Sequence, residues 1–209
     1  MTKPFEYLNT ITASIGMLLS YIGFIFLIIL ANKYGNYWHI IWCGIYGMTL
    51  MLLHTSSTLY HSTVSPDIKN KFLVMDQSCI YLLIAGTYTP IALINLYGIL
   101  GFSIFSAIWS LSILGIFLKI KNIKPFSNFE VFLCLFMGWF ALIGIKQLID
   151  KMDMNGIILI FIGGLLFTVG VFFLMWKTFR YSHAIWHLFY IGGCVCHYFT
   201  IIFYAIPYK

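Results

Sequence analysis

The chain has 209 residues, of which 61% are hydrophobic and only 9% are charged. Such a small number of charged side chains could not cover the surface of a soluble globular domain. The composition therefore excludes that class and indicates a polytopic membrane protein. The formal net charge of +6 does not indicate a nucleic-acid-binding protein, because the Lys and Arg residues lie in short loops between apolar segments. No polar stretch is long enough to form a second core, and we predict a single transmembrane domain over residues 1–209.

Seven apolar segments follow one another along the chain, each near the ~20 residues that a helix needs to cross a bilayer. They are residues 11–31, residues 38–60, two spans within residues 72–118, one span between Glu130 and Lys146, residues 156–176 and residues 182–206. Pro90, Tyr97, Gly98 and Gly101 are expected to divide the long third run into two helices. The charges of Glu130 and Lys146 are expected to extend toward the membrane interfaces. The prediction is an all-α bundle of seven transmembrane helices.

The orientation of the bundle follows from the Lys and Arg residues in alternate loops, which are more numerous on the cytoplasmic side. With the N-terminus in the cytoplasm, the cytoplasmic set is Lys3, Lys69, Lys71, Lys119, Lys121, Lys124, Lys177 and Arg180, and the external set is Lys33, Lys146, Lys151 and Lys209. The larger cytoplasmic set predicts a cytoplasmic N-terminus and an external C-terminus.

Two histidines, His183 and His187, lie four residues apart in an uncharged apolar stretch near the C-terminus. On a helix they share one face, about 6 Å apart along the axis, so both rings can reach a common point. Two imidazoles aimed at one point are half of a zinc site. The alternative is that each is a packing residue hydrogen-bonded to a neighbouring helix.

Helix direction brings further polar residues to the same depth. The second span ends at the cytoplasmic face with Ser57 and His61, the third begins there with Asp76, and the seventh begins there with His183 and His187. Three protein ligands with an open fourth position are typical of catalytic zinc. Asp76 could act as a base toward water at the metal, or could instead be an interfacial carboxylate that is hydrated or paired with a lysine.

Two other intramembrane histidines are not expected to bind this metal. His54 lies about 10 Å deeper than His61, and we interpret it as a hydrogen-bonding residue in helix packing. His197 lies about 15 Å along the axis from His187, which is too far for a common ion.

Several of these stretches resemble the haemolysin III family. They are the SxxxH pattern at residues 57–61, MDQSCIYLLIAGTYTP at residues 75–90, HAIWH at residues 183–187 followed by His197, and FEYLN at residues 5–9. The family belongs to a superfamily that includes progestin and adiponectin receptors and alkaline ceramidases. Many bacterial members carry Thr-His where this chain has Thr12 and Ala13, and Gln77 stands where a relative has histidine.

The resemblance implies a seven-helix bundle and a zinc ion. In the receptor relatives, the histidines matching His61, His183 and His187 bind zinc, and the aspartate matching Asp76 contacts the water at the metal. Ser57 matches the family's serine and is expected to orient Asp76 or that water. Glu6 and Asn9 match the family's N-terminal Glu-x-x-Asn motif, which could form an interfacial helix cap or a plug near the site.

These features predict a zinc-dependent hydrolase in the bacterial cell membrane. It would act on a lipid amide or ester at the cytoplasmic side, with membrane lipid as its partner and no nucleic acid; the ceramidase relatives suggest an amide. One alternative is a haemolysin-like pore or membrane-perturbing protein, although the spans offer few polar residues to line a pore. A second alternative is a receptor-like protein with structural zinc.

Overall fold

The computed structural model describes residues 6–121, 126–176 and 178–207. Every regular element in these ranges is a helix, and seven helical segments are long and apolar enough to cross a membrane. The predicted all-α, seven-span fold is therefore confirmed. Four members of the lysine and arginine count, Lys3, Lys124, Lys177 and Lys209, lie outside the described residues.

Three of the seven spans combine more than one helical element. In chain order the spans are α1 (Glu6–Tyr34); α2 (Tyr37–Ser62); α3 (Pro66–Pro90) with the π-helix η1 (Ile91–Leu96); α4 (Gly98–Lys121); α5 (Asn128–Gly138) with the 3-10 helix η2 (Trp139–Gly144) and α6 (Ile145–Lys151); α7 (Met154–Met175); and α8 (Ser182–Thr200) with the π-helix η3 (Ile201–Ala205).

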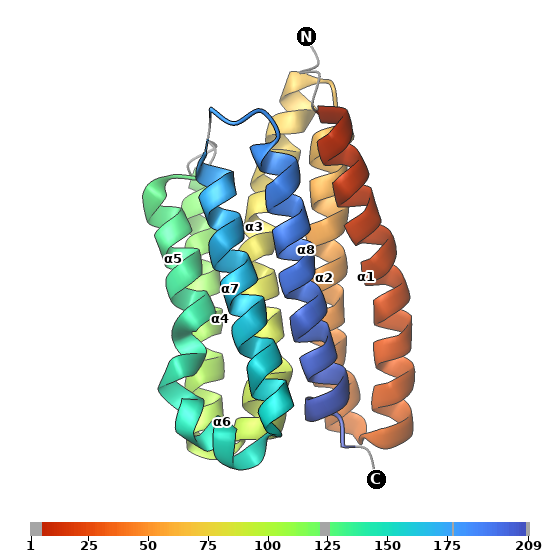
Figure 1. The fold of residues 1–209 in the computed structure, drawn as a ribbon, viewed down its shortest axis with the longest axis vertical. Coiled ribbons are helices and arrows are strands. Elements are labelled where there is room, and N and C mark those ends of the chain that lie inside the picture. Colours follow the sequence, from red (N-terminus) through yellow and green to blue (C-terminus); the bar gives the residue numbers. More distant parts are fainter. Residues whose placement is uncertain (1–5, 122–125, 177, 208–209) are drawn as a thin grey trace.

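The spans run up and down around α3 (Figure 1). Helix α2 packs between α1 and α3, α4 packs on α3, α7 packs along α8, and α8 returns to contact α1. In the most apolar 18-residue stretch of the third span, 72% is buried inside the protein, against 17% in the fifth and sixth spans. This difference places α3 at the centre of the bundle. The starts of α1, α3 and α8 and the end of α2 lie at one end of the bundle, shown at the top of Figure 1.

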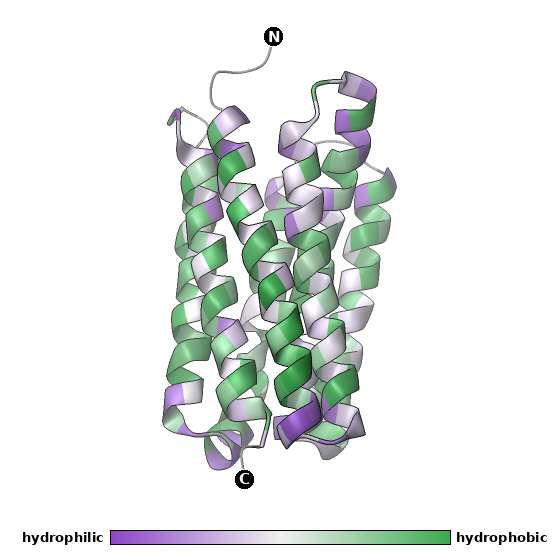
Figure 2. Ribbon diagram, turned by 90° about the vertical axis from the view of Figure 1, so that its right-hand side faces the viewer, coloured by the Kyte–Doolittle hydropathy of each residue, from purple (hydrophilic) through white to green (hydrophobic). Residues whose placement is uncertain are grey.

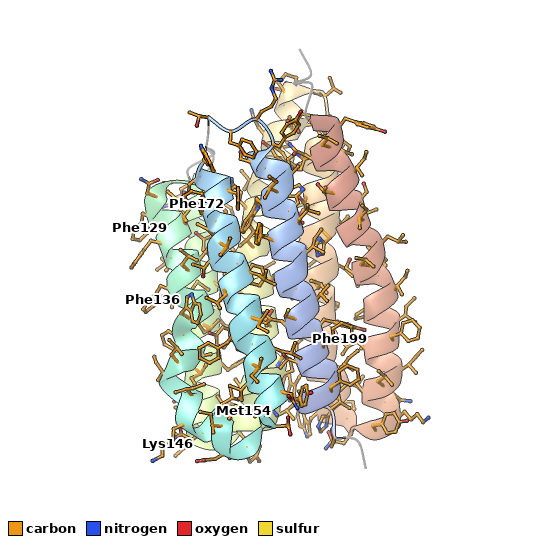
Figure 3. All side chains as sticks on the ribbon, in the orientation of Figure 1. Phe129, Phe136, Lys146, Met154, Phe172 and Phe199 are labelled. Atoms are coloured by element: carbon orange, nitrogen blue, oxygen red, sulfur yellow. The ribbon has the colours of Figure 1, made fainter. Side chains whose placement is uncertain are left out.

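The outer surface of the bundle is apolar between two polar ends. Figure 2 shows hydrophilic residues at the two ends and hydrophobic residues along the helices between them. Side chains labelled in Figure 3, such as Phe129, Phe136, Phe172 and Phe199, are exposed on this surface. Since a lipid-facing surface requires no polar groups, the exposed aromatic residues fit a multi-pass protein of the cell membrane.

Local signals fix the start of α2 at one end of the bundle and the start of α3 at the other. The Asn36 side chain accepts hydrogen bonds from the backbone N–H groups of Trp38 and His39, which starts α2 after a short turn. Pro66 lies in the first turn of α3, where its missing N–H would have no partner within the helix. Only residues 63–65 separate α2 from α3, so the end of α2 lies beside the start of α3.

The division between the third and fourth spans lies at Tyr97 and Gly98, whose φ angles are 42° and 75°. Pro90, which was also expected to divide this run, instead lies inside the span, where α3 passes into the wider turns of η1. Because proline has no N–H to donate, it is accommodated at this change of helix type and does not end the helix.

Glu130 does not extend toward the interface as expected. Its side chain is buried, with one carboxylate oxygen 2.7 Å from Lys119 Nζ and the other accepting from the backbone N–H of Ser127 at 2.8 Å. A charge removed from water requires a partner of opposite charge, and Lys119 at the end of α4 supplies it. The ion pair joins α4 to α5.

The fold leads to a test of orientation. We expect the N-terminus in the cytoplasm and the C-terminus outside, because an odd number of spans separates them and the lysine and arginine bias favours this direction. A reporter that is active only in the cytoplasm, fused after Lys209, should be inactive. A reporter active only after export should be active at the same position. If the cytoplasmic reporter were active there and the exported one inactive, the C-terminus would lie in the cytoplasm and the predicted orientation would be wrong.

Candidate metal centre

Three histidines converge at the end of the bundle where α2 finishes and α8 begins. His61 lies in the last turn of α2, and His183 and His187 lie in the first two turns of α8. One nitrogen from each ring forms a group in which all three atoms lie within 4.8 Å of one another. His61 and His187 are buried and His183 is half-buried. The structure therefore brings together the three residues expected from the sequence.

The spacing of these nitrogens suits a small metal ion. Tetrahedral zinc with Zn–N distances of about 2.0–2.1 Å places its nitrogen ligands about 3.3 Å apart. The Nε2 atoms of His61 and His183 are 3.1 Å apart. The wider separations in the group can be closed by rotation of an imidazole about its χ angles.

The opposite ring nitrogen of His61 faces a carboxylate. His61 Nδ1 lies 2.8 Å from Glu6 Oε2 in the first turn of α1. An ionised carboxylate can only accept a hydrogen bond, so Nδ1 carries the proton. In a neutral imidazole the lone pair is then on Nε2, which faces His183.

His187 is held in the same way by a hydroxyl group. Its Nδ1 lies 2.8 Å from Thr12 Oγ1 on α1. The Thr12 hydroxyl is 3.0 Å from the backbone carbonyls of both Leu8 and Asn9, so its hydrogen is donated to the backbone and its oxygen accepts from His187. The lone pair of His187 is therefore also on Nε2.

Asp76 and Ser57 lie beside the histidines. Both line a cavity of about 110 Å³ whose wall also includes His183 and His187. The Ser57 hydroxyl donates a hydrogen bond to the Asp76 carboxylate. Asp76 thus has its polar partner inside the bundle, and among the described residues it forms no ion pair with Lys71.

The remaining intramembrane histidines have other partners. His54 Nδ1 is 3.1 Å from the Tyr190 hydroxyl, and the two rings stack with centroids 5.2 Å apart. His197 Nε2 is 3.3 Å from the Ile160 carbonyl of α7. His54 thus makes the hydrogen bond to a neighbouring helix that was expected of it, and within the described ranges neither histidine belongs to the group of three.

The donor set fits zinc. His61 and His187 present neutral imidazole lone pairs to one point, and a change of tautomer lets His183 present a third. The imidazoles of His61 and His187 also donate their other N–H to an oxygen, as zinc-binding histidines commonly do. Within the described part of the chain, no fourth histidine, cysteine or carboxylate joins the group. The centre can therefore offer three ligands and leave one position open to a small molecule.

Glu6 and Thr12 are the site residues whose roles the sequence left open or missed. Glu6 was expected to be either a helix cap or a plug near the site, and it bonds directly to His61. In the sequence, Thr12 stands out only as part of a departure from the family's Thr-His pair, yet its own hydroxyl contacts His187. The available signal was their position, because both lie in the first two turns of a span that starts at the end of the bundle where the histidines lie.

Comparison with known proteins relates the chain as a whole to a family of membrane proteins. A family model described as "Haemolysin-III related" matches residues 1–198. The chain is 43% identical to a protein named "Hemolysin-3 homolog" from Bacillus subtilis, over 96% of this chain and 94% of that protein. It is 41% identical to "Hemolysin-3" of Bacillus cereus, over 97% and 92%. It is 28% identical to the human "Monocyte to macrophage differentiation factor", over 78% and 70%.

Proposed function

The chain belongs to the Haemolysin-III-related family of membrane proteins, and from this premise we propose that it is a zinc-dependent hydrolase that cleaves a lipid amide or ester at the cytoplasmic side of the membrane. One observation supports the proposal above others. Three imidazole nitrogens lie within 4.8 Å of one another, beside a largely apolar cavity that Asp76 and Ser57 also line.

His61, His183 and His187 would hold the ion through neutral imidazoles. Zinc with three such ligands and an open position activates water for attack and polarises a carbonyl group. The Glu6 and Thr12 contacts keep protons off the nitrogens of His61 and His187 that face the ion.

Asp76 is the proposed general base. Its carboxylate lines the same cavity as His183 and His187, so a water molecule between them can donate a proton to it as the water attacks a carbonyl carbon. The protonated carboxyl group then delivers that proton to the departing amine or alcohol. Ser57 donates its hydroxyl hydrogen to Asp76 and thereby positions the carboxylate.

The shape of the cavity supports a lipid substrate. Its lining continues from His183 and His187 past Phe167 and Trp139 to His197, and most of the residues between are apolar. His187 and His197 are ten residues apart on α8, which corresponds to about 15 Å along the axis. This length can accommodate part of an acyl chain while the carbonyl group near the head lies beside Asp76.

A pore is the second candidate. The name of the Bacillus relatives favours it. A water-filled pore needs polar groups along its full length, whereas residues such as Leu53, Ile84 and Leu83 line much of this cavity. A structural zinc, the third reading, is less favoured because such sites usually have four protein ligands, and three are found among the described residues.

The first prediction concerns metal content. The purified protein is expected to carry about one zinc per chain, and His61→Ala, His183→Ala and His187→Ala should each lose most of it, because a site with three ligands has none to spare. His54→Ala and His197→Ala are matched controls from the same helices and should retain zinc. If elemental analysis found the two groups of variants alike, the proposed site would be wrong.

The second prediction separates catalysis from structure. Asp76→Asn should lower hydrolysis of a lipid amide or ester by roughly 10²–10⁴-fold, because the amide cannot accept the proton, while zinc content and thermal stability stay near wild type. Ser57→Ala should have a smaller effect, since Ser57 acts through Asp76. The measurement is turnover across a panel of lipid amides and esters, with zinc content measured on the same samples.

Two outcomes would count against hydrolysis. A fully metallated wild-type protein that cleaves nothing in the panel would remove its support. Zinc-independent ion conduction by the purified protein in planar bilayers would favour the pore. Activity that survives Asp76→Asn would exclude Asp76 as the base.

A further inference from the structure

Helix α1 contacts two of the three histidines, although it supplies no metal ligand itself. Glu6 lies against His61 of α2, and Thr12 lies against His187 of α8. We propose that Glu6 and Thr12 are positioning residues for the metal: each holds the proton of its histidine on Nδ1, so that both Nε2 atoms stay free to bind. The inference rests on the proposed zinc site.

The Glu6 carboxylate is itself held in place from a second side. Its Oε1 lies 3.2 Å from Lys69 Nζ on α3, while its Oε2 bonds to His61. Lys69 is anchored in turn by the Thr63 carbonyl at 3.3 Å and lies over the Tyr60 ring, 4.8 Å from its centroid. Glu6 therefore joins α1, α2 and α3, and its position at Nδ1 is set by more than one bond.

The Thr12 contact selects a tautomer through the geometry of its own hydroxyl. Because the hydroxyl hydrogen is directed to the backbone carbonyls of the preceding turn, Oγ1 is left as an acceptor. A histidine with Nε2–H would place a lone pair against this oxygen, with no hydrogen between the two atoms. The contact therefore favours the Nδ1–H form of His187.

The effect of α1 on the metal should be separable from its effect on folding. Only 22% of the most apolar 18-residue stretch of α1 is buried, so the helix contributes a small share of the core. Thr12 and Glu6 are only partly buried, and replacing either leaves no large cavity in the core. Outer contacts of this kind typically change metal affinity 10–100-fold.

The test measures zinc affinity of the purified full-length protein by competition with a chelator. Thr12→Val keeps the shape of the side chain and removes the hydroxyl, and it should bind zinc about 10–100-fold more weakly. Thr12→Ser restores the hydroxyl and should restore the affinity. Thr10→Val is the matched control, because the Thr10 hydroxyl bonds to the Glu6 backbone carbonyl and not to a histidine.

Glu6→Ala should weaken zinc binding by a similar factor, and it should alter the visible absorption spectrum of the cobalt-substituted protein as His61 reorients. Asp67→Ala removes an exposed carboxylate at the same end of the bundle and should change neither. Thermal stability of the metal-free proteins is measured in parallel, and it should be equal in wild type and variants.

The outcomes separate this inference from the proposed function. If the wild type binds zinc and Thr12→Val and Glu6→Ala bind it equally well, the role of α1 is overturned and the zinc hydrolase stands. Loss of metal-free stability in both variants would also overturn it, in favour of a structural role. Weakened zinc binding by the two variants, together with a wild type that hydrolyses no lipid, would support the inference and contradict the proposed hydrolase. A wild type without zinc affinity would overturn both.

Discussion

Hydrocarbon offers a polar group no hydrogen-bonding partner, so a charged or polar group between these helices is stabilised when it pairs within the protein. The pairing of Lys119 with Glu130 between α4 and α5 is one result. Tyr88 is another, because its hydroxyl donates to the Gly138 carbonyl and accepts from the Ala141 N–H where α5 passes into a 3-10 helix. The irregular turns that would be costly in lipid are thus stabilised by side chains of neighbouring spans.

The same requirement organises the surroundings of the three histidines. A carboxylate at the start of α1 could not remain there alone, and Glu6 meets both the imidazole of His61 and the ammonium group of Lys69. Ser57 meets Asp76 in a comparable way inside the bundle. These contacts connect α1, α2 and α3 through a small number of polar atoms, so the position of His61 depends on the packing of α1 and α3, which carry none of the three histidines.

The span count and the meeting of His61, His183 and His187 could be predicted from the sequence, because apolar length fixes the number of crossings and alternating direction fixes depth. Pairings across helices were harder to predict. Which neighbour Glu130 or Thr12 faces depends on how each helix is rotated about its axis, and composition carries little information on rotation. Pro90 was misread for a different reason, since a change to π-helix lets a span continue past a residue that usually interrupts an α-helix.

The separation of the ligands along the chain has a consequence for assembly. His61 is 122 positions before His183, and four complete spans lie between them. Since a chain is synthesised from its N-terminus, the donor set stays incomplete until the final span has entered the bilayer and docked. Under the proposed zinc site, metal capture would therefore report on the whole biogenesis of the protein: a truncated or misinserted chain would expose His61 and Glu6 but could not close a chelate around an ion.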